Sequence, residues 1–184
     1  VHFNEWLEQE GWLDYDADQP DELPDELADI SDEARAYSLI PGRFYINLEG
    51  REPRGSVPES EYQETRAELK AELESLTGPD GREVVDRIVT KEDAFRGDHD
   101  EIAPDLVAIP NHGFDLKAGF GGDDDVFGTG PRNGMHSFDN ACLYIDDSDA
   151  LVTDADLYDI APTILTLLEM DYDRGSFDGA TLLK

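Results

Sequence analysis

The stretch RFYINLEGREPRG, residues 43–55, places a strand pattern directly before a loop pattern near the middle of the first half of the chain. Its first six residues, 43–48, are rich in aromatic and β-branched side chains, which favour a strand. The glycines, proline and arginines of residues 50–55 indicate a loop. A strand that leads into a long polar loop is the starting point for the fold.

A helix is predicted after this loop, over residues 61–77, because four apolar residues recur there at helical spacing. Ser60 and Gln63 fit a capping box at its start. The turn sequence GPDG, residues 78–81, indicates where it ends. The apolar stripe consists of Tyr62, Leu69, Leu73 and Leu76.

Further elements are predicted on both sides of this centre from apolar content and periodicity. Strands are expected at residues 83–90, 105–109, 113–118 and 141–145. Helical segments are expected at residues 2–10 and 157–170, with a brief helical turn at 31–37 and a Gly/Asp-rich loop at 119–134. Alternating strands and helices predict an α/β fold, a layered sheet with flanking helices, in which residues 44–90 allow an α+β excursion.

The charge of the chain is its main compositional feature: 45 acidic residues against 14 basic ones give a net charge of −31. A localised acidic tail would indicate a basic partner, but here the acids are spread along the chain. Uniform acidity with few lysines favours adaptation to high salt, where ions screen the self-repulsion of the surface. The fold is therefore expected to loosen in dilute buffer.

Residues 14–29 form an acidic, proline-containing segment that is predicted to be a loop. Asp14, Asp16 and Asp18 have the spacing that opens an EF-hand calcium loop. The glycine required at the sixth position is replaced by Gln19, and prolines interrupt the loop. A solvated acidic loop is therefore favoured over a calcium site.

Several functional classes are excluded by what the sequence lacks. No cluster of Lys and Arg provides a nucleic-acid-binding face. Cys142 has no second cysteine to pair with, and its apolar surroundings predict an inert thiol. No apolar run approaches the about 20 residues that span a bilayer, and no signal peptide is visible. The expected location is cytoplasmic, and because the chain opens without Met in a helix-like segment, a fragment is expected and export stays open.

The four histidines are the candidate metal ligands, and only one has a suggestive context. His2 has no partner nearby in sequence, and His99 lies among acids that favour an exposed, charge-paired residue. His112 follows Asn111, a poor ligand for a divalent cation, so a turn residue is favoured. His136 lies between a Gly-rich loop and an apolar segment, which leaves two alternatives: a turn residue, or a metal ligand at a strand end. No nucleophile motif is present.

The order of these segments resembles the type I phosphodiesterase / nucleotide pyrophosphatase group of the alkaline phosphatase superfamily. Residues 1–13 look like the segment that follows the Asp-His-Gly metal motif of that group. Residues 45–57 look like its INLxGRxPxGxV segment, and residues 93–106 like its run that ends in APDL. Residues 159–165, DIAPTIL, follow in the same order.

This resemblance implies an alkaline-phosphatase-like α/β core with two divalent metals, usually zinc, with Mn or Mg as alternatives. His136, preceded by Gly134, matches the histidine of the family's Gly-x-His-x-x-x-Gly pattern and is thereby implied to be a metal ligand. The later glycine of that pattern is Asn140 here, and the usual arginine after the histidine is Ser137. The nucleophile, a Thr or Ser, and the other metal ligands are implied to lie upstream of Val1.

The sequence thus predicts that residues 1–184 are a single domain, the C-terminal portion of a metal-dependent hydrolase of phosphoester or phosphoanhydride bonds. Its partner would be a small phosphoester or nucleotide substrate, and the fragment alone is expected to be inactive. One alternative is another superfamily activity, that of a sulfatase, phosphoglycerate mutase or phosphonate hydrolase. The other is a non-catalytic acidic binding or scaffold domain. Substrate, metal and oligomeric state stay open.

Overall fold

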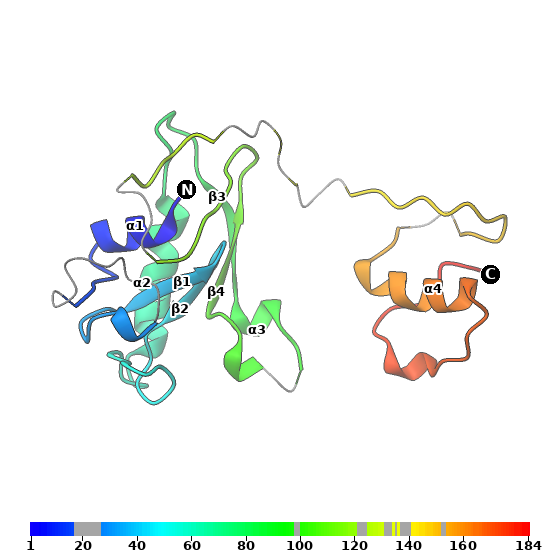
Figure 1. Cartoon of the computed structure of the whole chain (residues 1–184), viewed down its shortest axis with the longest axis horizontal. Coiled ribbons are helices and arrows are strands. Elements are labelled where there is room, and N and C mark those ends of the chain that lie inside the picture. Colours follow the sequence, from blue (N-terminus) through cyan, green and yellow to red (C-terminus); the bar gives the residue numbers. More distant parts are fainter. Residues whose placement is uncertain are drawn as a thin grey trace. The chain divides into compact units, whose positions relative to one another are not determined.

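The computed structural model describes residues 1–16, 27–97, 100–120, 125–130, 134, 136, 141–151 and 154–184. The chain divides into two compact units, Val1–Met135 and His136–Lys184 (Figure 1). The expectation that residues 1–184 form a single domain within a longer protein stays a prediction.

The first unit is built on a four-stranded antiparallel sheet in the order β1-β2-β4-β3. The strands are β1 (Ala36–Ile40), β2 (Arg43–Ile46), β3 (Val85–Thr90) and β4 (Leu106–Pro110). Three of them confirm the strands predicted at residues 43–48, 83–90 and 105–109. With its flanking helices this is a mixed α/β fold, compatible with part of an alkaline-phosphatase-like protein.

The helical turn predicted at residues 31–37 is wrong: residues 31–35 contain a turn but no helix, and β1 begins at Ala36. β1 and β2 form a hairpin around Gly42, which has a φ of 71°. A Cβ on Gly42 would lie 2.7 Å from the carbonyl oxygen of Ala108, so a side chain is excluded there. The Pro41-Gly42 pair is a turn signal between two apolar runs, and it favours a hairpin over a helix.

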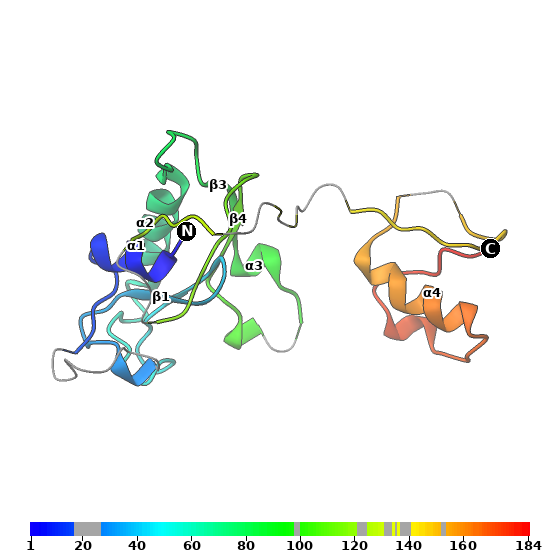
Figure 2. The ribbon, with the colours of Figure 1, turned by 45° about the horizontal axis from the view of Figure 1, so that its top comes forward.

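Three helices accompany the sheet: α1 (Phe3–Gln9), α2 (Tyr62–Ser75) and the short α3 (Lys91–Ala94). α1 packs against β1, and α2 packs against β2, β3 and β4 (Figures 1 and 2). The helices predicted at residues 2–10 and 61–77 are confirmed. The capping box is wrong, since α2 begins after Glu61 and no side chain caps it.

One hydrophobic core joins these elements, and the sequence pattern explains it. The apolar stripe of α2 supplies Leu69 and Leu73, both fully buried. Phe3 of α1 meets Phe44 of β2 edge to face, with ring centroids 4.8 Å apart. Edge-to-face pairs stabilise by about 0.5–1.5 kcal/mol beyond their burial, so this contact fixes α1 on the sheet.

The ends of the acidic segment 14–29 are held together by backbone contacts. Tyr15 forms an antiparallel bridge with Ile30, and the Asp16 amide donates to the Asp29 carbonyl over 3.2 Å. A 3₁₀ turn occupies Leu27–Asp29. Asp18 and Gln19, which decide the calcium-loop hypothesis, lie outside the described residues.

Two other predicted strands are absent from the structure. Residues 113–118 contain only an isolated bridge between Lys117 and His2. Residues 141–145 form no strand, and Cys142 is exposed, so the expectation of a buried, inert thiol is wrong. Both stretches are apolar enough for a strand, but neither has a neighbouring strand to complete a ladder.

The second unit contains α4 (Ile160–Leu167), which follows a 3₁₀ turn at Leu157–Asp159. The helix predicted at 157–170 is confirmed in its central part, and Pro162 occupies the first turn of α4 as expected. The side chain of Asp159 accepts hydrogen bonds from the backbone amides of Asp156 and Ala180, 2.9 and 2.8 Å away. Asp159 thus ties the start of α4 to the segment that returns beside it.

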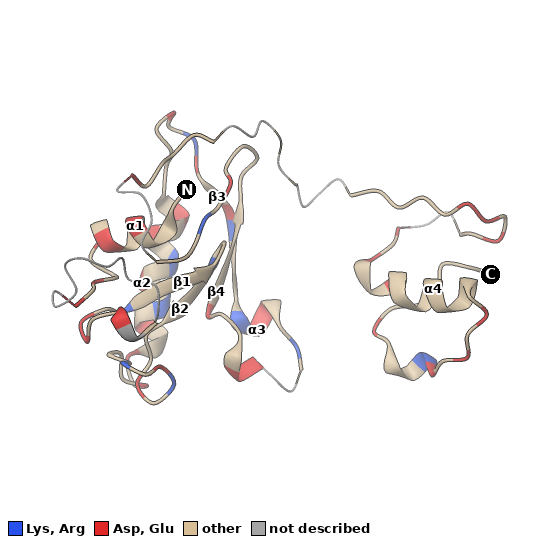
Figure 3. Ribbon diagram, viewed as in Figure 1, with Lys and Arg blue, Asp and Glu red and all other residues tan. Residues whose placement is uncertain are grey.

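Acidic side chains occur on helices, turns and loops of both units, whereas basic ones are few (Figure 3). This distribution matches the spread of acids expected from the sequence. Among the helices of the described residues, none combines the length and apolar character that crossing a bilayer requires.

Candidate functional site

His136, the predicted metal ligand, is an exposed residue at the beginning of the second unit. Gly134 is exposed as well, and residues 137–140, which carry the rest of the family pattern, lie outside the described residues. Within the described ranges no group of three or more His, Cys, Asp or Glu side chains could hold a metal ion. The described residues therefore supply the exposed imidazole of His136 as one possible metal ligand, without a cluster of further ligands around it.

The two other histidines of the described residues, His2 and His112, belong to the first unit. His2 pairs with Lys117 in the isolated bridge noted above. His112 lies in a turn, as predicted, and its carbonyl oxygen accepts a hydrogen bond from Arg82 over 3.1 Å. His99 lies outside the described residues.

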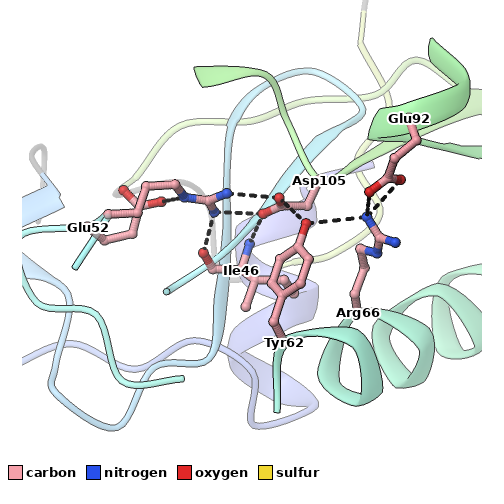
Figure 4. Close-up of polar contacts among 7 residues, drawn as sticks. Ile46, Glu52, Tyr62, Arg66, Glu92 and Asp105 are labelled. Atoms are coloured by element: carbon pink, nitrogen blue, oxygen red, sulfur yellow. Dashed lines mark hydrogen bonds and ion pairs between the residues drawn. The ribbon is translucent and has the colours of Figure 1, made fainter. Parts of the chain in front are cut away.

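The structure reveals a buried polar cluster that the sequence did not predict, centred on Asp105 (Figure 4). Asp105 directly precedes β4, and its side chain is fully buried. It accepts two hydrogen bonds from the Arg51 guanidinium, 2.9 and 2.7 Å long. The Ile46 amide and the Tyr62 hydroxyl donate to the same carboxylate over 2.7 and 2.6 Å. Four donors thus compensate one buried charge.

Arg51 belongs to the loop after β2 and is shared between two carboxylates. Its Nε donates to Glu52 over 2.7 Å, while Nη2 also donates to the Ile46 carbonyl oxygen over 2.7 Å. Burial alone would lower the pKa of Arg51, but Asp105 and then Glu52 raise it above its ordinary value. The guanidinium is therefore a fixed cation that attaches the loop to the start of β4.

The cluster continues along α2 toward α3. Burial raises the pKa of Tyr62, and its hydrogen bond to Asp105 adds to the effect. Arg66 lies one turn further along α2 and donates to the Tyr62 hydroxyl over 3.3 Å and to Glu92 over 2.8 Å. The hydrogen bond from Arg66 lowers the pKa of Glu92. The chain of contacts thereby connects α2, α3 and β4 at one end of the sheet (Figure 4).

The second loop arginine, Arg54, binds the acidic segment instead. Its guanidinium pairs with Asp16, and its Nε donates to Asp32 over 2.7 Å. Both loop arginines are thus ion-paired, although a loop arginine is also suited to binding an anion. Arg51 thus attaches the loop to a buried acid, whereas Arg54 attaches it to exposed acids.

The loop that carries both arginines has little conformational freedom. A Cβ on Gly55 would lie 2.1 Å from the Leu48 carbonyl oxygen, so only glycine allows this approach. Asn47 donates through Nδ2 to the carbonyl oxygens of Ala34 and Arg54, both 2.8 Å away. The GREPRG stretch is therefore a conformationally restricted loop between β2 and α2, in agreement with its turn-forming composition.

One sequence signal could have revealed this cluster. The segment DLVAI, residues 105–109, places a single acid at the head of an otherwise apolar strand. Buried carboxylates are almost always paired, so a buried strand that begins with Asp requires a cation elsewhere. The chain has 14 Lys and Arg residues, two of them in the GREPRG loop, and which of them reaches Asp105 depends on the tertiary fold.

A comparison with protein families matches residues 1–139 to the family described as "Type I phosphodiesterase / nucleotide pyrophosphatase". The match covers the whole sheet, the Asp105 cluster and His136. Neither the curated proteins nor the solved structures contain a match to this chain.

Proposed function

The chain belongs to the type I phosphodiesterase / nucleotide pyrophosphatase family, and we propose that it is part of a metal-dependent hydrolase of phosphoester or phosphoanhydride bonds. The observation that carries this proposal is the family match over residues 1–139, which includes His136. The substrate class follows from the family, and a small phosphoester or a nucleotide is the proposed substrate.

We propose that His136 is one ligand of a divalent metal, zinc in the first instance. Its imidazole is accessible, and neutral imidazole is a common zinc ligand. A catalytic zinc site uses three protein ligands, so His136 alone does not hold the metal tightly. The remaining ligands, and the Thr or Ser nucleophile, are proposed to lie upstream of Val1 in a longer protein.

The proposed reaction is attack of that hydroxyl on phosphorus, which breaks the P–O bond to the alcohol or phosphate leaving group, followed by attack of water on the covalent phospho-enzyme, which releases the phosphoryl product and restores the hydroxyl. Bound divalent metals would stabilise the charge that develops on the phosphoryl oxygens. The part assigned to this chain is to present His136 beside the Gly-rich segment. The isolated chain is accordingly proposed to be inactive.

Hydrolysis of bis-p-nitrophenyl phosphate tests the proposal. The protein would be extended upstream of Val1 and assayed in molar KCl with Zn²⁺ or Mn²⁺. We expect metal-dependent turnover that collapses in His136→Ala. His112→Ala is the matched control, since His112 is also exposed but lies in the turn after β4. That control should retain full activity.

The remaining outcomes separate the alternatives. Turnover that survives His136→Ala would keep the hydrolase assignment and remove His136 from the metal site. Turnover of sulfate esters or phosphonates in place of phosphodiesters would assign another activity of the superfamily. No turnover with any metal would favour a non-catalytic binding or scaffold role.

A further inference from the structure

A hollow of about 190 Å³ opens in the first unit, and two residues of the Asp105 cluster, Arg51 and Glu52, contribute to its lining. Its lining includes side chains from both strands of the hairpin, from the GREPRG loop and from the 3₁₀ turn at Asp100–Ile102. The residues that matter for its chemistry are Tyr37, Tyr45, Arg51, Glu52 and Glu101.

One wall of the hollow is an aromatic pair. Tyr37 on β1 and Tyr45 on β2 are cross-strand partners, and their rings stack with centroids 5.3 Å apart and planes 8° apart. Tyr37 is only 2% exposed, whereas Tyr45 is partly exposed. Tyr45 therefore supplies the accessible aromatic surface, and the electron-rich face of such a ring attracts cations.

The charge of the hollow is negative despite the presence of Arg51. The buried carboxylate of Asp105 already neutralises that guanidinium through two hydrogen bonds. Glu52 shares the same guanidinium through Nε, and its side chain is 11% exposed. Glu101 also lines the hollow and is exposed, and none of the ion pairs among the described residues includes it. Glu52 and Glu101 thus provide carboxylate charge that no second cation of the hollow offsets.

We propose that this hollow is a binding site for a small planar organic cation of the guanidinium class. Such a cation can stack on the Tyr45 ring and donate its N–H groups to the Glu52 carboxylate, both of which line the hollow. An anion is repelled by the uncompensated carboxylates. An inorganic ion such as Ca²⁺ is bound mainly by carboxylates, and among the described residues no group of three or more His, Cys, Asp or Glu could hold a metal ion. The site is independent of the proposed phosphodiesterase function.

The test is a backbone-amide NMR titration of the full chain with methylguanidinium at constant ionic strength in KCl. Methylurea is the matched ligand control, because it is also planar and donates hydrogen bonds but carries no charge. We expect saturable shifts at Tyr45, Glu52 and Glu101, which line the hollow, with methylguanidinium and none with methylurea. Equal responses to both ligands, or no saturation at these residues, would overturn the proposal.

Two variants locate the interaction. Glu52→Gln preserves the acceptor for Arg51 Nε and removes the charge, and Tyr45→Leu removes the ring while preserving apolar volume. Each should weaken methylguanidinium binding about tenfold, which corresponds to about 1.4 kcal/mol. Glu59→Gln removes an exposed charge outside the hollow and should leave binding unchanged. Amide spectra of the free variants check that each is folded, and wild-type affinity in both folded variants would refute the site.

Discussion

Replacement of Asp105 by Asn is the perturbation whose cost follows most directly from the structure. The change keeps the size of the side chain but removes a charge that is fully buried and accepts four hydrogen bonds. It also turns one acceptor into a donor that faces Arg51 and Tyr62. Removing one partner of a buried ion pair costs about 3–5 kcal/mol. We expect the free energy of unfolding to fall by that amount.

Urea denaturation in molar KCl, followed by tryptophan fluorescence, measures this loss. Urea is uncharged and leaves the ionic strength constant, and Trp6 and Trp12 are both buried in the core of the first unit. Asp86→Asn is the matched control, since Asp86 pairs with Arg87 at the surface and should cost less than about 1 kcal/mol. If Asp105→Asn costs no more than this control, the cluster is not the stabilising contact that its geometry indicates.

The energetic coupling between the charges of Asp105 and Arg51 provides a second test of their pairing. Arg51→Met alone leaves the Asp105 carboxylate buried with only the Ile46 amide and the Tyr62 hydroxyl as donors. The double variant removes both charges, so its loss should be smaller than the two single losses added together. Strict additivity would contradict the direct pairing of Arg51 with Asp105.

Three further outcomes are expected. Burial raises the pKa of Tyr37 and of Tyr62 above about 10, the ordinary value. The unfolded chain therefore loses these two protons first, so the contribution of Tyr37 and Tyr62 to stability is constant below pH about 10 and falls as pH rises further. The part of the tyrosine absorbance change that is lost in Tyr37→Phe should coincide with unfolding, and its appearance in the folded protein would contradict this. The melting temperature should rise from dilute buffer to molar KCl, because salt screens the repulsion among 45 acidic residues that 14 basic residues do not balance. A constant melting temperature would refute adaptation to salt. Cys142 is exposed and should react with an aromatic disulfide reagent without denaturant, unlike a protected thiol.

Elements with a local signal were predictable from the sequence. The leucine stripe of α2 and the apolar runs of β2, β3 and β4 gave positions within a few residues of those in the structure. In each case the apolar residues lie on one helix face or along one strand, and residues of that apolar pattern pack into the core. The chemistry-bearing residue His136 was identified only through resemblance to a family, because a single histidine beside glycines has no distinctive local signature.

Features that depend on partners distant in sequence were missed. Residues 113–118 and 141–145 have strand composition, but a strand exists only where a neighbour supplies hydrogen bonds. Asp105 and Arg51 lie 54 positions apart. Nothing in the loop distinguishes Arg51, which reaches the buried acid, from Arg54, which reaches the surface. The antiparallel order of the sheet likewise depends on how β4 inserts, and no local pattern specifies that insertion.

The position of β4 also constrains when the first unit can assemble during synthesis. Among the four strands of this sheet, β4 is the last to leave the ribosome, yet it lies between β2 and β3, and β3 has no other partner in the sheet. The β1–β2 hairpin can form early, but β3 must wait, and Arg51 stays without its buried acid until Asp105 emerges. A nascent chain that stops short of residue 105 therefore has neither the complete sheet nor its central ion pair. Protease resistance should appear in one step as the chain lengthens past β4, not in gradual increments.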